Sequence, residues 1–226
     1  MGPAASDPPL VALHNRITSC RRCVDRGLLG AATPILPAPV LAPVVLVGQA
    51  PGRLEVESAL PFSGRAGKQL FRWLAEAGAG PESEARRTIY LTSMTKCFPG
   101  PASSGSGDRR PSTEEVSLCQ PHLDGQLDIL RPRLLLAVGQ LAIARYLGVR
   151  PMDQLVGRVF DGSGRELEVT LESVPPSTGA PWVLPLPHPS GASRWLNQPG
   201  HRSLLAEALA RMSLLLAAIS RGCPLK

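Results

Sequence analysis

Short apolar runs recur along the chain, and segments with a helical period separate them. The runs at residues 44–47, 134–138 and 182–186 are apolar at nearly every position, which is typical of strands buried on both faces of a parallel sheet. A fourth run at residues 88–94 predicts another strand. Residues 165–174 alternate between polar and apolar positions, which favours an edge strand or a hairpin.

Helices are predicted in the intervening segments, over residues 10–17, 63–77, 113–130, 140–147 and 203–219. Ser63 is a suitable N-cap for the second of these helices, and Gly78 is a suitable stop. Strands that alternate with helices indicate an α/β protein. We therefore expect a single-domain three-layer α/β/α sandwich around a central, mostly parallel four-stranded sheet, with a loose tail at residues 1–9 and one domain over residues 10–226.

Composition narrows the class of protein only a little. The chain has 226 residues, of which 43% are hydrophobic, and its net charge is +6. The hydrophobic fraction argues against disorder, and the positive charge favours a polyanionic partner such as nucleic acid. No apolar run approaches the roughly 20 residues of a membrane span, and the first ten residues do not resemble a secretion signal. We expect no membrane partner and a cytoplasmic location.

Four cysteines are candidates for one metal or cluster site. Cys20 and Cys23 have the two-residue spacing that lets one loop offer both sulfurs to a metal, while Cys97 and Cys119 follow later in the chain. Zinc and an iron–sulfur cluster both fit four thiolates, and the spacing does not decide between them. The alternative is that Cys97 and Cys119 are unrelated buried thiols. Cys223 is expected to be a bystander.

The first apolar strand runs directly into Gly48, Gln49, Ala50, Pro51 and Gly52. Glycine and proline end a strand abruptly, and open α/β sheets bind ligands beyond the carboxyl ends of their strands. The sequence therefore predicts a ligand crevice at this loop. Many α/β proteins share such a loop, so the prediction depends on the motifs that accompany it.

Six short motifs occur in a fixed order from Cys20 to the closing helix. They are Cys20-x-x-Cys23, Gly48-Gln49-Ala50-Pro51-Gly52, Pro61-Phe62-Ser63-Gly64-Arg65-Ala66-Gly67, Thr95-Lys96-Cys97, Cys119 and His188-Pro189-Ser190. Together they resemble the iron–sulfur uracil-DNA glycosylases of bacteria and archaea, mainly those of type four, with some likeness to type five.

The resemblance implies a 4Fe–4S cluster of structural role, held by Cys20, Cys23, Cys97 and Cys119. It also implies a DNA repair enzyme of base excision, which we expect at the nucleoid. Such an enzyme flips uracil or a related deaminated base out of DNA, hydrolyses the N-glycosidic bond and leaves an abasic site. The sequence gives no reason to expect an oligomer, so we expect a monomer. No lysine stands out as a Schiff-base nucleophile, so we expect a monofunctional glycosylase.

Catalysis must stabilise negative charge on the departing base and positive charge on the sugar. The resemblance assigns the first task to His188, with the backbone N–H groups of Gln49 and Ala50 beside it, close to Gly48. The family usually has Glu where Gln49 stands, and type-one enzymes have a catalytic Asp where Ala50 stands. Glu55 is therefore our candidate for the catalytic carboxylate, and a solvated loop glutamate is the alternative.

Two residues are expected to recognise the base. Phe62 would stack on it, unless the ring is only a core aromatic. The family generally has Asn where Ser93 stands, and an amide can pair with both N3–H and O4 of uracil. A serine hydroxyl has one donor and cannot form that pair. We therefore expect weaker selection against other bases.

The residues after His188 are expected to enter the minor groove and fill the space of the flipped base. They are Ser190, Gly191, Ala192, Arg194 and Trp195. Ala192 is too small to act as a wedge, so Arg194 or Trp195 is the candidate, although Trp195 could instead pack against the closing helix. Lys68, Arg109, Arg110 and Arg202 are candidate phosphate contacts.

Two rival interpretations stay open. One is a non-catalytic iron–sulfur DNA-binding module of the same fold, because Ser93 and Val56 depart from the family pattern. The other is a zinc-stabilised α/β protein that binds a small ligand at residues 48–52. The sequence does not reveal the preferred base, the preferred strand state or any further role of the cluster.

Overall fold

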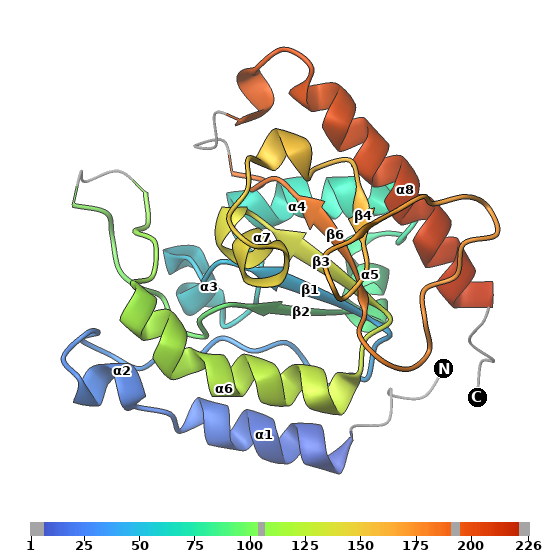
Figure 1. Cartoon of the computed structure of the whole chain (residues 1–226). Coiled ribbons are helices and arrows are strands. Elements are labelled where there is room, and N and C mark those ends of the chain that lie inside the picture. Colours follow the sequence, from blue (N-terminus) through green and yellow to red (C-terminus); the bar gives the residue numbers. More distant parts are fainter. Residues whose placement is uncertain (1–6, 104–106, 191–194, 222–226) are drawn as a thin grey trace.

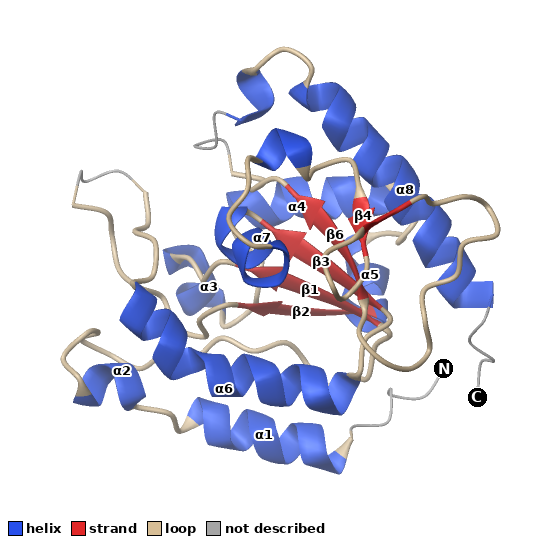
Figure 2. Cartoon of the chain, in the orientation of Figure 1, coloured by secondary structure: helices blue, strands red, loops and turns tan. Residues whose placement is uncertain are grey.

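The computed structural model describes residues 7–103, 107–190 and 195–221, which fold as helices on both faces of one sheet (Figures 1 and 2). The sheet has six strands in the order β2-β1-β3-β6-β4-β5. Its four central strands are parallel: β1 (Val44–Gly48), β2 (Ile89–Ser93), β3 (Leu134–Val138) and β6 (Trp182–Leu186). All four were predicted from the sequence, within one residue at either end.

The prediction of a four-stranded sheet was incomplete. Two short strands, β4 (Val159–Phe160) and β5 (Glu166–Leu167), extend the sheet in antiparallel orientation beyond β6. The alternating stretch at residues 165–174 forms strand only over β5. Two-residue strands carry too little periodicity to be recognised in a sequence.

The α-helices are α1 (Pro8–Thr18), α2 (Arg22–Asp25), α3 (Arg53–Ser58), α4 (Arg65–Glu76), α5 (Glu82–Thr88), α6 (Thr113–Leu130), α7 (Gln140–Leu147) and α8 (His201–Arg221). Two 3₁₀ turns are η1 (Met152–Gln154) and η2 (Trp195–Asn197). The five longer predicted helices are all present. α2, α3 and α5 were missed because helices of four to seven residues show less than two full turns of periodicity. α1 begins earlier than expected, since Asp7 caps it by accepting a hydrogen bond from the Leu10 N–H.

Alternate side chains of each central strand enter opposite hydrophobic layers. In β1, Val44 and Leu46 pack with α4, α5 and α8, whereas Val45 and Val47 pack with α1, α6 and α7. Every residue of β1 is buried. This arrangement is the predicted three-layer sandwich, and it explains why the strand is apolar at consecutive positions.

Contrary to the expectation from the sequence, the closing helix α8 is long and apolar enough to cross a membrane by length and composition alone. Its buried residues, including Leu209, Met212 and Leu215, belong to the hydrophobic layer between α8 and the sheet. In Figure 1 the helix lies against the sheet alongside β6 and β4. Packing against the sheet therefore accounts for the apolar residues on the buried face of α8.

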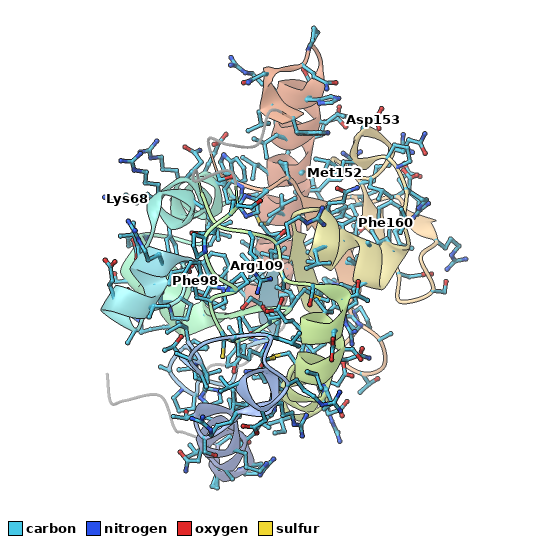
Figure 3. The ribbon with its side chains drawn as sticks, turned by 90° about the vertical axis from the view of Figure 1, so that its left-hand side faces the viewer. Lys68, Phe98, Arg109, Met152, Asp153 and Phe160 are labelled. Carbon is cyan, nitrogen blue, oxygen red and sulfur yellow. The ribbon has the colours of Figure 1, made fainter. Side chains whose placement is uncertain are left out.

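The order of the central strands locates the ligand crevice. The chain passes from β1 to β2 on one side of β1, and then crosses to β3 on the other side. Such a change of direction opens a crevice at the carboxyl ends of the two strands where it occurs, here β1 and β3. The loops that follow β1, β2, β3 and β6 all leave the sheet at this edge, which faces the viewer in Figure 3.

Candidate functional site

Phe62 lies over the end of β1 in a strained conformation. Its φ of 56° is in the left-handed region, which bulky residues rarely adopt. The ring covers Gly48 so closely that a Cβ there would lie 2.7 Å from Phe62 Cζ. The Phe62 carbonyl sits against Gly67, where a Cβ would lie 1.6 Å from the oxygen. Both glycines are therefore required for Phe62 to hold its place.

Glu55 fastens the loop that carries Phe62. One carboxylate oxygen accepts a hydrogen bond from the Gly52 N–H at the start of α3, and the other accepts one from the Phe62 N–H. Burial raises the pKa of Glu55, the two backbone N–H groups oppose that rise, and the charge of Asp108 adds to it. The candidate catalytic carboxylate thus has both oxygens engaged by backbone groups, as a brace between the two ends of this loop.

His188 follows β6 and lies against the end of β3. A Cβ at Gly139, whose φ is 83°, would lie 3.2 Å from His188 Cδ2. The Ser190 N–H donates to His188 Nδ1 over 3.2 Å, and Ser190 Oγ lies 2.8 Å from the same nitrogen. Because Nδ1 accepts a hydrogen bond, the proton of the neutral ring resides on Nε2. Burial lowers the pKa of His188, which keeps the ring neutral near pH 7.

Ser93 ends β2 and pairs in register with Gly48 of β1. Its side chain is buried, and its hydroxyl donates to the Thr95 carbonyl over 2.7 Å. With that proton committed, the Ser93 oxygen can act toward a ligand only as an acceptor. An amide at this position would offer a ligand both a hydrogen-bond donor and an acceptor, whereas Ser93 offers the acceptor alone.

Lys96 is a fully buried lysine behind Ser93, and in the sequence it stands out only as part of the motif Thr95-Lys96-Cys97. Its ammonium donates to the Ser93 carbonyl over 2.5 Å and to Thr92 Oγ1 over 2.8 Å. Its backbone N–H donates to Cys119 Sγ over 3.2 Å. Burial lowers the pKa of Lys96 to about 8. One residue thus connects the end of β2 with a cysteine of the predicted cluster site.

The four predicted ligand cysteines come together. Cys20, Cys23, Cys97 and Cys119 line one cavity between the N-terminal segment, the loop after β2 and helix α6. Burial, supplemented by the neighbouring cysteines, raises the pKa of Cys97 to about 12 and that of Cys23 to about 11. Four thiols so close together become thiolates only if a bound cation compensates their charge.

The cavity lining also contains polar atoms without a hydrogen-bond partner in the described part of the chain. Two buried polar atoms of its lining, Thr95 Oγ1 and His122 Nε2, have no hydrogen-bond partner among the described residues. They are available to a group bound between the cysteines. Within residues 7–103, 107–190 and 195–221, no three His, Cys, Asp or Glu side chains are arranged to hold a single metal ion. Four cysteines on one cavity fit the thiolate set of a zinc ion as well as that of a 4Fe–4S cluster.

The expected minor-groove loop is only partly described. Gly191, Ala192 and Arg194 lie outside the described residues. Trp195 stacks on the His201 ring at the start of α8, with ring centroids 4.1 Å apart. This contact agrees with the alternative in which Trp195 packs against the closing helix.

One candidate phosphate contact is already neutralised. Arg109 forms a bidentate ion pair with Glu115, with N···O distances of 2.6 and 2.7 Å. Burial alone would raise the pKa of Glu115, but hydrogen bonds from Arg109 and Ser112 outweigh it and hold that pKa below its usual value. In Figure 3 Arg109 lies near the middle of the face, whereas Lys68 lies at its margin on α4. Lys68 is exposed and stays a candidate.

Comparisons with known proteins place this geometry in a family. The model of the "Uracil DNA glycosylase superfamily" matches residues 37–211. A type-4 uracil-DNA glycosylase of Pyrobaculum aerophilum is 31% identical over 72% of this chain and 79% of the relative. The type-4 enzyme of Archaeoglobus fulgidus is 36% identical, over 56% of this chain and little more than half, 57%, of the relative. A type-5 enzyme of P. aerophilum is 32% identical over 70% of this chain and 72% of the relative.

The close approach of Gly67 to Phe62 yields a prediction. In Gly67→Ala the new methyl group must displace the Phe62 carbonyl, so we expect the free energy of unfolding to fall by about 1–3 kcal/mol or more. Urea denaturation measures this change. Gly30→Ala is the control, because a Cβ there meets no atom within 4 Å. Equal stability of the two variants would contradict the described position of Phe62.

Proposed function

The chain belongs to the uracil DNA glycosylase superfamily, and on this premise we propose that it is a monofunctional DNA glycosylase. Its substrate is DNA that contains uracil or a related deaminated base. It flips that base into the crevice at the carboxyl ends of β1 and β3, hydrolyses the N-glycosidic bond and leaves an abasic site. This repair takes place in the cytoplasm at the nucleoid, and the enzyme acts as a monomer.

The observation that carries the proposal is that Phe62 and His188 lie at the carboxyl ends of two neighbouring strands. Phe62 covers the end of β1 and His188 covers the end of β3, and these strands are neighbours in the sheet. A planar base between them stacks on Phe62. The Nε2–H of His188 donates to the base oxygen on which negative charge develops. The N–H groups of Gln49 and Ala50 add donors to the same oxygen.

The expected bond cleavage requires no lysine nucleophile. Lys96 is buried and its ammonium is engaged by Ser93 and Thr92. This environment supports a hydrolytic reaction without a lyase step. The non-catalytic DNA-binding module remains the second candidate, because Ser93 replaces an amide that the family uses to recognise uracil.

The first prediction concerns His188 and the reaction itself. The protein should release uracil from an oligonucleotide that carries one uracil, as detected by alkaline cleavage of the abasic site. His188→Gln should slow single-turnover release by about 10²–10³-fold, because a donor to the developing anion is lost. Ser190→Ala should have a smaller effect, since the Ser190 N–H still orients the ring.

The pH dependence checks the protonation state of His188. Because burial lowers the folded-state pKa of His188, the rate should hold through the pH range in which a free histidine gains its proton and decline only at lower pH. If the wild-type protein binds DNA but releases neither uracil, hypoxanthine nor xanthine from single-stranded or mispaired substrates, the non-catalytic module is the correct interpretation.

The second prediction concerns base selection at Ser93. The acceptor-only hydroxyl suits a ring N–H of the base but cannot donate to O4 of uracil. Ser93→Asn should therefore increase the preference for uracil over other bases, as measured by the ratio of single-turnover rates on the base panel. An unchanged rate and an unchanged preference would show that Ser93 does not contact the base.

The third prediction concerns the cofactor. We propose that Cys20, Cys23, Cys97 and Cys119 hold a 4Fe–4S cluster that joins the N-terminal segment to the sheet. When bound, the cluster supplies the charge that keeps these thiols deprotonated, and it has no step in the reaction.

Protein purified without oxygen should absorb in the visible range and contain iron and acid-labile sulfide. Cys119→Ser should lose both, whereas Cys223→Ser should retain them. Zinc without sulfide would contradict the cluster.

A further inference from the structure

The proposed reaction calls for a carboxylate close to the sugar of the flipped nucleotide. Hydrolysis through an oxocarbenium-like sugar benefits from a carboxylate near C1′ that stabilises the cation and orients water. Gln49 and Ala50 bring no carboxylate. Glu55 accepts a hydrogen bond through each of its oxygens, from the N–H groups of Gly52 and Phe62, so it braces the loop and its carboxylate is held in place there.

A second carboxylate reaches the same loop from a different part of the chain. A Cβ at Gly52 would lie 2.8 Å from Asp108 Oδ2 and 3.3 Å from Glu55 Oε2. Gly52 ends the loop that follows β1, whereas Asp108 belongs to the connection between β2 and α6. The Asp108 carboxylate therefore lies against the loop that forms one wall of the crevice. Asp108 is exposed, so it is open to a ligand that enters there.

Two sets of contacts hold the backbone around Asp108. Asp108 forms an antiparallel bridge with Pro101, beside which the Arg109 N–H donates to the Gly100 carbonyl over 3.0 Å. The Arg109 side chain is anchored in turn by its bidentate ion pair with Glu115, which is almost fully buried at the N-terminus of α6. These contacts fix the backbone position of Asp108 relative to the crevice. Because the Arg109 guanidinium is paired with Glu115, it does not pair with the Asp108 carboxylate.

The electrostatic environment agrees with this placement. The charge of Asp108 contributes to the raised pKa of Glu55, which requires the two carboxylates to be near each other. Their roles differ because Glu55 is half-buried and bonded to two backbone groups, whereas Asp108 is exposed. The exposed carboxylate of such a pair is the one that can approach a sugar and a water molecule.

We propose that Asp108 is a catalytic residue whose carboxylate faces C1′ of the flipped nucleotide. The inference rests on the proposed glycosylase function. The C1′–N1 bond breaks, its electron pair leaves with the base, and His188 Nε2–H donates to the resulting anion. The Asp108 carboxylate stabilises the sugar cation and then accepts a proton as the water oxygen bonds to C1′. Asp108 afterwards releases that proton to solvent.

Single-turnover kinetics of the cofactor-loaded, full-length protein test this role. Asp108→Asn should slow uracil release by about 10²–10³-fold, as expected for the loss of a general base. Affinity for an oligonucleotide with a non-cleavable 2′-fluoro-deoxyuridine should stay nearly constant, because the base pocket is intact. Formate added to Asp108→Ala should restore part of the rate, which a merely structural residue would not allow.

Asp153→Asn is the matched control, because it removes an exposed carboxylate from η1 on the same face (Figure 3). It should react at the wild-type rate. The proposal is wrong if Asp108→Asn also reacts at that rate, if it loses substrate affinity as much as rate, or if Glu55→Gln abolishes chemistry while Asp108→Asn does not. If the wild-type protein releases no base at all, the proposed function itself has failed.

Discussion

The parallel pairing of β1 with β2 on one side and β3 on the other is the constraint on which the site depends. Parallel strands end at the same edge of a sheet, so the loops after all three strands meet there. Both faces of these strands are covered by helices, and their residues are buried throughout. A shift in this pairing would move Gly48, and Phe62 with it, relative to Ser93 on β2 and to Gly139 and His188 beside β3.

At this edge of the sheet, Phe62 has a strained backbone conformation at the place where the base is expected to bind. Phe62 keeps a left-handed backbone because Glu55 binds its N–H and Gly67 leaves room for its carbonyl. Strained residues of this kind persist only when their surroundings determine them fully, and they are common at ligand clamps. A ring that is already in place costs little additional entropy when a base stacks on it. The glutamate of the loop therefore contributes to the site by positioning, whichever carboxylate acts on the sugar.

Buried polar contacts connect this edge with the cysteine cavity. Tyr90 of β2 receives a hydrogen bond from Gln126 and contacts His14 of α1. Lys96 continues these contacts from Ser93 to Cys119. Since buried polar groups are costly unless they are satisfied, these contacts keep α1, β2 and α6 in one arrangement. A group held by the four cysteines would therefore be connected to β2 through Lys96 and helix α6.

The sequence by itself determined the four central strands, the five longer helices, the order of the motifs and the cysteines that gather. These features depend on local periodicity and on short-range spacing, which can be read directly from the chain. Only the tertiary structure decided that Glu55 braces Phe62, that Arg109 is occupied by Glu115 and that Ser93 has committed its proton to Thr95. It alone brought Asp108 to Gly52, because contacts between residues far apart in sequence arise from packing and leave no periodic signal along the chain.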